Sequence, residues 1–167
     1  QSHLNMRSTS DKVVFSCSKI TDCLIRMTTL IRAFCAGDEA DLSRVFQSSI
    51  RGLASGKYST EQIEAWAGAS LDLEHWVHRM RELRPFVVEV GGVISAYGDL
   101  QDCGYIDHFF VAEMYARRGC GSALISHIIK NAIDREIPIL TADVSLAAQQ
   151  FFARFGFVLV EQRSKVI

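Results

Sequence analysis

The sequence predicts a single α/β domain whose mixed sheet is flanked by helices. Three observations favour this fold class: a length of 167 residues that suits one domain, a hydrophobic content of 49% with only two prolines, and strand-like and helical segments that alternate along the chain. The expected order is β-α-α-α-β-β-β-α-β-α-β. Met27 precedes the first of these strands. We therefore expect the domain to cover residues 27–167, with residues 1–26 as an N-terminal leader or an extension added by cloning.

The first part of the chain is expected to form one strand and three helices. The strand covers residues 29–34, and Asp38 can cap the helix that follows, whose apolar residues recur at helical spacing. Ser59-Thr60-Glu61-Gln62 has the form of a capping box and predicts the start of a second helix. A third helix begins near Asp72 and must end before Pro85. The apolar positions of the first helix are Leu42, Val45, Phe46, Ile50 and Leu53.

The middle of the chain is predicted to form a hairpin and then another strand. Residues 86–90 and 93–98 are β-rich, and Gly91-Gly92 between them suits a two-residue turn with positive φ angles. These two strands should pair antiparallel. The next strand, over residues 105–111, leads into a glycine-rich turn.

The last part of the chain is expected to add two helices and two strands. A long helix follows the glycine-rich turn, because apolar residues recur on one of its faces. A strand over residues 137–143 comes next, then a short helix over residues 145–155 that Gly156 ends in the left-handed conformation, and a final strand over residues 157–161. The apolar face of the long helix is Leu124, Ile125, Ile128, Ile129, Ala132 and Ile133.

Charge and cysteine content exclude several classes of function. The 18 basic and 19 acidic residues give a formal net charge of -1, so no surplus field would attract nucleic acid or an anionic membrane. No apolar run approaches the ~20 residues that span a bilayer. The five cysteines are odd in number and include no Cys-x-x-Cys pair, which predicts free thiols in a reducing cytoplasm and no metal site. We therefore expect a cytoplasmic protein that binds neither nucleic acid nor membrane.

The glycine-rich turn contains the strongest functional signal. It is Arg117-Arg118-Gly119-Cys120-Gly121-Ser122, and it opens the long helix. Backbone N–H groups at the positive end of a helix dipole can bind a pyrophosphate, and the glycines let the backbone approach it closely. Cys120 has no histidine base beside it in the sequence, so we do not expect a catalytic thiol. The turn predicts a ligand that contains phosphate.

Two other phosphate-binding motifs fit this turn poorly. A Rossmann motif would use Gly119, Gly121 and, at the end of the next strand, Asp143, but its third glycine position is Leu124. Too little sequence follows to complete a dinucleotide-binding sheet. A Walker motif would need a lysine before Ser122.

Two segments resemble motifs of the GCN5-related N-acetyltransferase (GNAT) family. Residues 111–124, VAEMYARRGCGSAL, are similar to motif A, written Q/R-x-x-G-x-G/A, and residues 145–157, SLAAQQFFARFGF, are similar to motif B. The likeness extends over residues 30–162. It implies a mixed, mostly antiparallel sheet flanked by helices. It also implies an acetyl-CoA-dependent N-acetyltransferase that moves an acetyl group to a small-molecule amine by direct attack in a ternary complex.

The resemblance implies which residues bind the cofactor. Backbone groups of Phe109, Phe110 and Val111 would meet the pantetheine arm, and the motif A amides would hold the pyrophosphate. Ser145 and Phe152 of motif B would belong to the same site. The residues of the motif A turn are Arg117, Arg118, Gly119, Cys120, Gly121 and Ser122.

Two residues depart from the family pattern. Ala116 stands at the Q/R position of motif A, so a phosphate contact there must come from the backbone or from Arg117 and Arg118. Phe152 stands where many members have a tyrosine that protonates the departing thiolate, and Phe152 has no proton to give. Ser145 or a water is then the expected donor, although Ser145 also suits a helix N-cap. The departures leave a second hypothesis open, a non-catalytic module that binds or senses acyl-CoA.

The strand before the turn contains the candidates for a general base. An alkylammonium has a pKa of about 10 and must lose a proton before it attacks. Alternation places Tyr105 and Asp107 on one face of the strand and His108 on the other. The pKa of His108 is best suited to a base at neutral pH, whereas Asp107 would need its pKa raised by burial. Tyr58 and Trp66 are expected in the acceptor pocket, and the sequence leaves a homodimer open.

Overall fold

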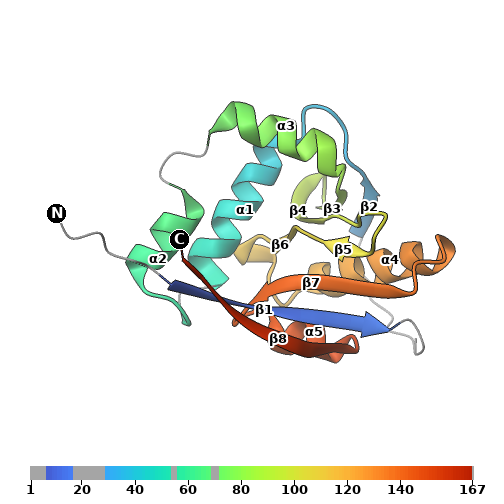
Figure 1. The fold of residues 1–167 in the computed structure, drawn as a ribbon. Helices are drawn as coiled ribbons and strands as arrows, with labels where there is room; N and C mark the ends of the chain where they lie inside the picture. The colour runs from blue at the N-terminus through green and yellow to red at the C-terminus, as the bar shows by residue number, and fades with distance from the viewer. Residues whose placement is uncertain (1–6, 17–28, 54–55, 69–71, 167) are drawn as a thin grey trace.

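The computed structural model describes residues 7–16, 29–53, 56–68 and 72–166 (Figure 1). The strands are β1 (Arg7–Ser16), β2 (Thr29–Ala33), β3 (Phe86–Val90), β4 (Val93–Gly98), β5 (Tyr105–Ile106), β6 (Phe109–Val111), β7 (Ile139–Ser145) and β8 (Phe157–Val166). The helices are α1 (Glu39–Leu53), α2 (Thr60–Ala67), α3 (Leu73–Leu83), the 3-10 helix η1 (Glu113–Tyr115), α4 (Cys120–Asp134) and α5 (Gln149–Arg154). The α/β class predicted from the sequence is confirmed.

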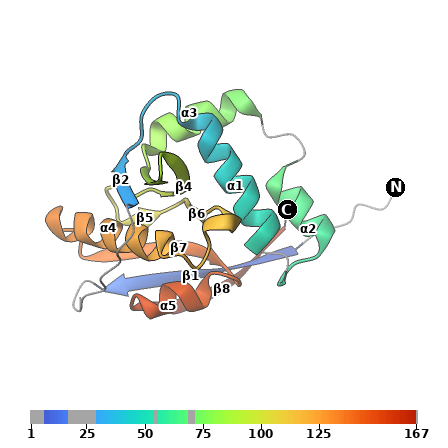
Figure 2. The ribbon, with the colours of Figure 1, turned by 180° about the vertical axis from the view of Figure 1, so that it is seen from behind.

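The described strands form two four-stranded sheets, in the orders β2-β3-β4-β6 and β5-β7-β1-β8. Every pairing is antiparallel except the one between β5 and β7. Helices α1, α2 and α3 lie on one side of the molecule, and α5 lies beside β8 on the other (Figure 1 and Figure 2). The arrangement is the mixed, mostly antiparallel sheet with flanking helices that the family resemblance implied.

The chain passes from one sheet to the other between β5 and β6. The sequence predicted one strand over residues 105–111, and the structure interrupts it at Asp107 and His108. The backbone N–H groups of these two residues donate to one carboxylate oxygen of Asp99, at 3.0 and 2.7 Å. Because this carboxylate takes the place of a strand partner, the ladder ends there and the two sheets separate.

Strand β1 was not expected from the sequence. It lies between β7 and β8 and pairs antiparallel with both. Val13 of β1 is 3% exposed and belongs to the core. The partners of β1 lie near the other end of the chain, and a local sequence pattern does not reveal such a pairing. Residues 7–16, assigned above to an extension, therefore form part of the sheet, while residues 1–6 and 17–26 lie outside the described residues.

Two buried clusters stabilise this arrangement. One includes Leu124 and Ile128 of α4 and lies against both sheets. The other packs α1, α2 and α3 against β3 and β4, and its centre includes Leu42 and Met80. The predicted apolar face of α4 is buried, except that Ile133 is 38% exposed. The two clusters lie on opposite faces of the β2-β3-β4-β6 sheet, because Val88 and Ala96 belong to the first and Val87 and Tyr97 to the second.

Several predicted chain reversals are confirmed. The capping box of residues 59–62 is present, and the side chain of Asp72 caps α3. Gly91 and Gly92 have φ angles of 60° and 79° in the hairpin between β3 and β4. Among the described residues, no helix has both the length and the apolar character needed to cross a bilayer.

The start of the last helix was predicted wrongly. The helix expected from Ser145 begins at Gln149, because the N–H of Ala148 donates to the carbonyl of Ser145 at 2.9 Å and closes a turn there. Ser145 is the last residue of β7. It is therefore not a helix N-cap, and its side chain is available to the site.

Candidate functional site

The glycine-rich turn joins η1 to α4 with two residues in the left-handed region. Arg117 has φ 60° and Gly119 has φ 87°. The first hydrogen bond of α4 runs from the N–H of Ala123 to the carbonyl of Gly119. The N–H groups of Cys120, Gly121 and Ser122 therefore precede the helical ladder and lie at the positive end of the helix dipole. N–H groups placed in this way can bind an anion.

The two glycines of the turn have different roles. Gly119 has a φ that L side chains rarely adopt. At Gly121, a Cβ atom would meet the Phe151 ring and the Val111 side chain at 3.3 Å. Gly121 therefore allows α5 and β6 to approach α4, in addition to leaving its own N–H accessible.

A groove of about 920 Å³ begins at this turn and follows β6 toward the end of β7. A volume of this size lies at the upper end of the range for small-molecule sites. Most of the predicted cofactor residues line it: Phe109, Phe110, Val111, Arg117, Gly119, Gly121, Ser122, Ser145 and Phe152. The other lining residues are Ser49, Ile50, Leu53, Trp66, Ala116, Ala147, Ala148, Gln150, Phe151 and Arg154.

Two predicted cofactor residues do not line the groove. Arg118 is exposed at the outer side of the turn, and the Cys120 side chain is 2% exposed and belongs to the core. Only the backbone N–H of Cys120 can then serve an anion. The sequence alone could not show which residues of the turn face the groove and which face away from it.

A smaller cavity of about 70 Å³ adjoins the groove. The described residues that line it include Asp107 and Asp143 and no basic residue. Six of the described residues line both this cavity and the groove and form their shared wall. They are Trp66, Phe109, Phe110, Ser145, Ala148 and Phe152.

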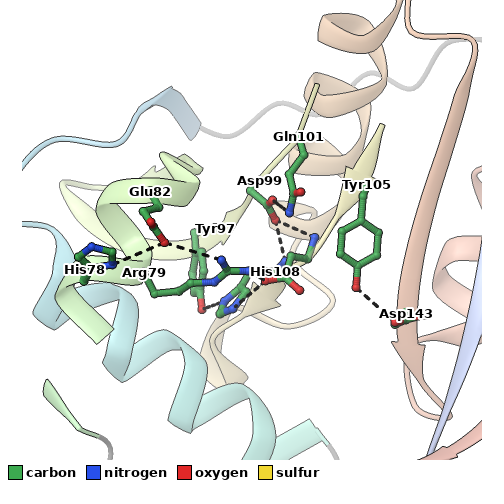
Figure 3. A network of polar contacts seen from close by, with 10 residues as sticks. His78, Arg79, Glu82, Tyr97, Asp99, Gln101, Tyr105, His108 and Asp143 are labelled. Carbon is green, nitrogen blue, oxygen red and sulfur yellow. Dashed lines mark hydrogen bonds and ion pairs between the residues drawn. The ribbon is translucent and has the colours of Figure 1, made fainter. Parts of the chain in front are cut away.

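Asp99 fixes the strand break beside this cavity (Figure 3). It is fully buried, and its carboxylate accepts the N–H groups of Asp107 and His108. Burial raises the pKa of Asp99 to about 6, the negative charge of Asp107 adds to this rise, and the hydrogen bond from the His108 N–H opposes it. Asp99 thus positions two of the three base candidates without facing either cavity.

His108 lies in an aromatic pocket rather than in a cavity wall. Its Nδ1 is 3.0 Å from the hydroxyl oxygen of Tyr97, and its ring packs against Phe46, Trp76 and Phe110. Burial lowers the pKa of His108 to about 4, against the opposing charge of Asp107. The imidazole is therefore neutral at neutral pH, and it lines neither the groove nor the small cavity.

Asp107, in the break between β5 and β6, and Asp143 of β7 both line the small cavity. Asp107 is paired with Arg79 of α3 and lies 3.6 Å from Nε2 of His108. The parallel register of Tyr105 with Thr141 brings the Tyr105 hydroxyl beside Asp143, to which it donates at 3.2 Å. Burial, followed by the negative charge of Asp143, raises the pKa of Tyr105.

Asp143 lines the small cavity, although the sequence analysis considered it only for a Rossmann motif. A signal for it existed: Thr141, Asp143 and Ser145 alternate with buried residues along β7. Such alternation predicts that the three polar side chains share one face of the strand. What the sequence could not show is that this face borders the cavity.

Tyr58 and Trp66, both predicted in the acceptor pocket, have different positions. Trp66 lines the shared wall. Tyr58 lines neither cavity. Its hydroxyl instead accepts a hydrogen bond from the N–H of Leu146 at 3.1 Å, and its ring contacts Trp66 with centroids 5.6 Å apart.

Phe152 occupies the position of the family's motif B tyrosine within an aromatic cluster. It is 1% exposed and meets Phe109, Phe151 and Phe157 edge to face. Phe152 is nevertheless among the residues that line both cavities. No group of three or more His, Cys, Asp and Glu side chains in the described part of the chain could hold a metal ion.

Comparisons with known proteins agree with this geometry. The family model described as an acetyltransferase (GNAT) domain matches residues 54–166. An uncharacterized N-acetyltransferase of Escherichia coli K12, YafP, is 34% identical over 137 residues, which are 80% of this chain and 83% of that protein.

Solved structures show the same fold. A GCN5-related N-acetyltransferase of Rhodopseudomonas palustris superposes with a TM-score of 0.77 at 28% identity, covering 87% of this chain and 100% of the other. The PaiA N-acetyltransferase of Thermoplasma acidophilum, solved in complex with coenzyme A, has a TM-score of 0.66 at 16% identity, covering 84% of this chain and 100% of that one. The chain therefore belongs to the GNAT family and is an N-acetyltransferase of that type.

Proposed function

We propose that this enzyme transfers the acetyl group of acetyl-CoA to a small-molecule amine by direct attack within a ternary complex. The observation that carries the proposal is the shared wall between the groove and the small cavity. Two ligands that fill these spaces at once would meet at that wall. Direct transfer needs such an encounter, because the nucleophile must approach the thioester carbon while both substrates are bound.

The groove supports acyl-CoA as the donor. The N–H groups that open α4 can hold the pyrophosphate, and Arg117 at the groove wall can add positive charge. The aromatic residues Phe109 and Phe110 line the part of the groove expected for the pantetheine arm. PaiA, a structural neighbour, binds coenzyme A in its solved complex.

The small cavity supports a cationic acceptor. Two acidic residues, Asp107 and Asp143, line it, and Asp107 is also paired with Arg79. These acidic residues favour an ammonium group over an anion. Its volume of about 70 Å³ is far smaller than the volume of about 920 Å³ of the groove. The cavity therefore suits the amine end of a small molecule, while the rest of the acceptor must extend along the opening.

The proposed reaction moves one acetyl group and removes two protons from the amine nitrogen. The bound ammonium first gives one proton to Asp107 or Asp143, directly or through one water. The neutral amine nitrogen then forms a bond to the carbonyl carbon, and the carbon–sulfur bond breaks with its electron pair staying on sulfur. The second proton leaves the nitrogen as the amide forms and passes to the thiolate or to water. A thiol pKa of about 8.5 makes the thiolate a tolerable leaving group even though Phe152 has no proton to donate.

The three base candidates then take different parts. Asp107 borders the acceptor cavity together with Asp143, and these are the proposed proton acceptors. Tyr105 orients Asp143 through its hydroxyl. His108 supports the strand break from the far side of Asp107. The cytoplasmic location and the homodimer considered from the sequence stay predictions.

Release of free thiol from acetyl-CoA, measured with a panel of amines, tests this function. The panel should include primary aliphatic amines, diamines and arylamines. A G119V variant, in which we expect weaker cofactor binding, is the control protein. We expect thiol release that depends on the amine, is largest with a primary aliphatic amine and is lost in G119V. Coenzyme A binding without acetylation of any amine would contradict the proposal.

A further inference from the structure

Among the described residues of the shared wall, only two have a side-chain hydrogen on nitrogen or oxygen. These are Trp66 and Ser145, since the other four residues are phenylalanine or alanine. Both can donate a hydrogen bond at the place where the two ligands would meet. Trp66 lies in α2 and Ser145 ends β7, so local structure alone does not hold them together.

Tyr58 contacts the segments of both donors. Its hydroxyl accepts the N–H of Leu146, the residue after Ser145, at 3.1 Å and across 88 positions of sequence. The Tyr58 ring meets the ring of Trp66 edge to face, at 74° and with centroids 5.6 Å apart. Tyr58 is half-buried and lines neither cavity, so it contacts residues of the wall without being part of the wall itself.

The two segments that Tyr58 joins are each fixed locally. On its own side, the Ser59 N–H donates to the Gln62 side chain at 2.9 Å, and the Gln62 N–H donates to the Ser59 hydroxyl at 3.3 Å. On the other side, the Ala148 N–H donates to the Ser145 carbonyl at 2.9 Å. A single hydrogen bond between two stiff segments can therefore set their relative position.

We propose that Tyr58 is a positioning residue that fixes the position of Trp66 relative to Ser145 at the shared wall. The inference rests on the proposed function, because it takes this wall as the meeting point of acyl-CoA and amine. Tyr58 couples two parts of the wall: its hydroxyl holds the turn at residues 145–148, and its ring contacts Trp66. Coenzyme A that orders this turn would then also order Trp66.

The Y58F variant removes the hydroxyl and keeps the ring. One neutral hydrogen bond contributes modestly, so we expect kcat to fall about 3- to 10-fold and the Kd for coenzyme A to rise about 3-fold. Y115F is the matched control. Tyr115 of η1 is half-buried and packs against both core clusters, but it contacts neither residue of the pair. Y115F should behave as the unmodified enzyme does.

Tryptophan fluorescence gives a readout that general loss of stability does not mimic. The chain has two tryptophans, so a W66F variant supplies the signal of Trp76 alone for subtraction. We expect coenzyme A to change the Trp66 emission in the unmodified enzyme and in Y115F, and to change it less in Y58F. Circular dichroism and thermal melting of each variant verify that it is folded.

A second variant tests the same hydrogen bond from its other end. Leu146 is the second residue of the turn that begins at Ser145, and this turn position favours proline. Ser145 is in a strand conformation, which tolerates a proline as the next residue. L146P removes the donor N–H, whereas L146A keeps it. The effects of Y58F and L146P should not multiply in the double variant, because each removes the same bond.

Two results would overturn the inference. One is a Y58F enzyme whose kcat, coenzyme A affinity and Trp66 response equal those of Y115F. The other is a Y58F/L146P double variant whose loss is the product of the single losses. The fluorescence arm uses coenzyme A alone and needs no turnover. If no amine were acetylated, the proposed function would fail, while the comparison of Y58F with Y115F would still decide the role of Tyr58.

Discussion

The groove that we propose for the cofactor and the cavity that we propose for the acceptor are built in different ways. The proposed phosphate end of the groove depends on backbone: two residues with positive φ, three helix N–H groups and a glycine against which α5 packs. The acceptor cavity depends on side chains that arrive from α2, the β5–β6 break and β7. A backbone site follows from a short local motif, whereas a side-chain site exists only after the strands have paired.

This difference predicts which changes will separate the two sites. A substitution that alters the turn backbone should weaken coenzyme A binding with every acceptor. A substitution in the cavity should change use of the amine and leave coenzyme A binding intact. The variants below test whether coenzyme A binding and use of the amine can be changed independently.

The largest effect is expected from G119V. A β-branched residue with φ near 87° is strained, and relief of the strain would turn the motif A amides away from the groove. We expect the Kd for coenzyme A to rise about 30- to 100-fold, as measured by isothermal titration. G92V is the control, since Gly92 has φ 79° and open space around it in the β3–β4 hairpin. Equal affinity of G119V and G92V would refute the turn assignment.

D143N and D107N come next, and they test the acceptor side. Loss of a carboxylate from the cavity wall removes one charge that attracts an ammonium group, so kcat/KM for the amine should fall about 10- to 30-fold. The Kd for coenzyme A should change by less than about 2-fold, within the range of neutral surface changes. D134N, at the exposed end of α4, is the control. A rise in the Kd for coenzyme A as large as the fall in kcat/KM would mean that the same residue serves both sites, and it would contradict their independence.

D99N tests the strand break through pH. The folded-state pKa of Asp99 is raised from 3.8 to about 6, so the folded protein binds this proton more tightly than the unfolded chain does. Stability from this group is therefore lost as pH rises from about 4 to about 6. D99N should not lose it, and its stability relative to the parent should increase over that interval by about 1–2 kcal/mol.

Urea unfolding at pH 4.5 and pH 7 measures this difference. The lowered pKa of His108 gives the parent an opposite slope, since that group favours the folded state as pH rises from about 4 to 6.5. The comparison of D99N with the parent cancels the His108 contribution. A relative stability of D99N that decreases with pH would show that Asp99 is stabilised as a charge rather than penalised by burial.

G121A has the smallest expected effect. The added Cβ would meet Phe151 and Val111 at 3.3 Å, and a shift of the Phe151 ring can accommodate it. We expect less than about 1 kcal/mol of lost stability and a coenzyme A Kd raised about 2- to 3-fold. Thermal melting and titration measure both. An effect on affinity as large as that of G119V would mean that Gly121 also meets the ligand closely.

The sequence predicted the elements that depend on local signals. The capping box at residues 59–62, the Gly91-Gly92 hairpin and the apolar face of α4 are all local patterns, and all are confirmed. The motif A turn is also a local pattern, because glycines at the start of a helix indicate a tight turn in the sequence itself. The family resemblance supplied the fold that these elements form.

The parts that the sequence did not predict depend on distant contacts. Strand β1 exists through pairing with β7 and β8. The break in residues 105–111 exists because Asp99 accepts two N–H groups. Asp143 joins the site through the parallel register of β5 and β7, and Tyr58 reaches Leu146 only in the folded chain.

Initial rates with both substrates varied give the most direct test of the central claim, that acyl-CoA and an amine occupy the two cavities together and react at their shared wall. The measurement uses acetyl-CoA and the best amine of the panel, with thiol release as the signal. The account predicts double-reciprocal lines that intersect, which require a complex of the enzyme with both substrates. Parallel lines, which indicate an acetyl-enzyme formed before the amine binds, would contradict it.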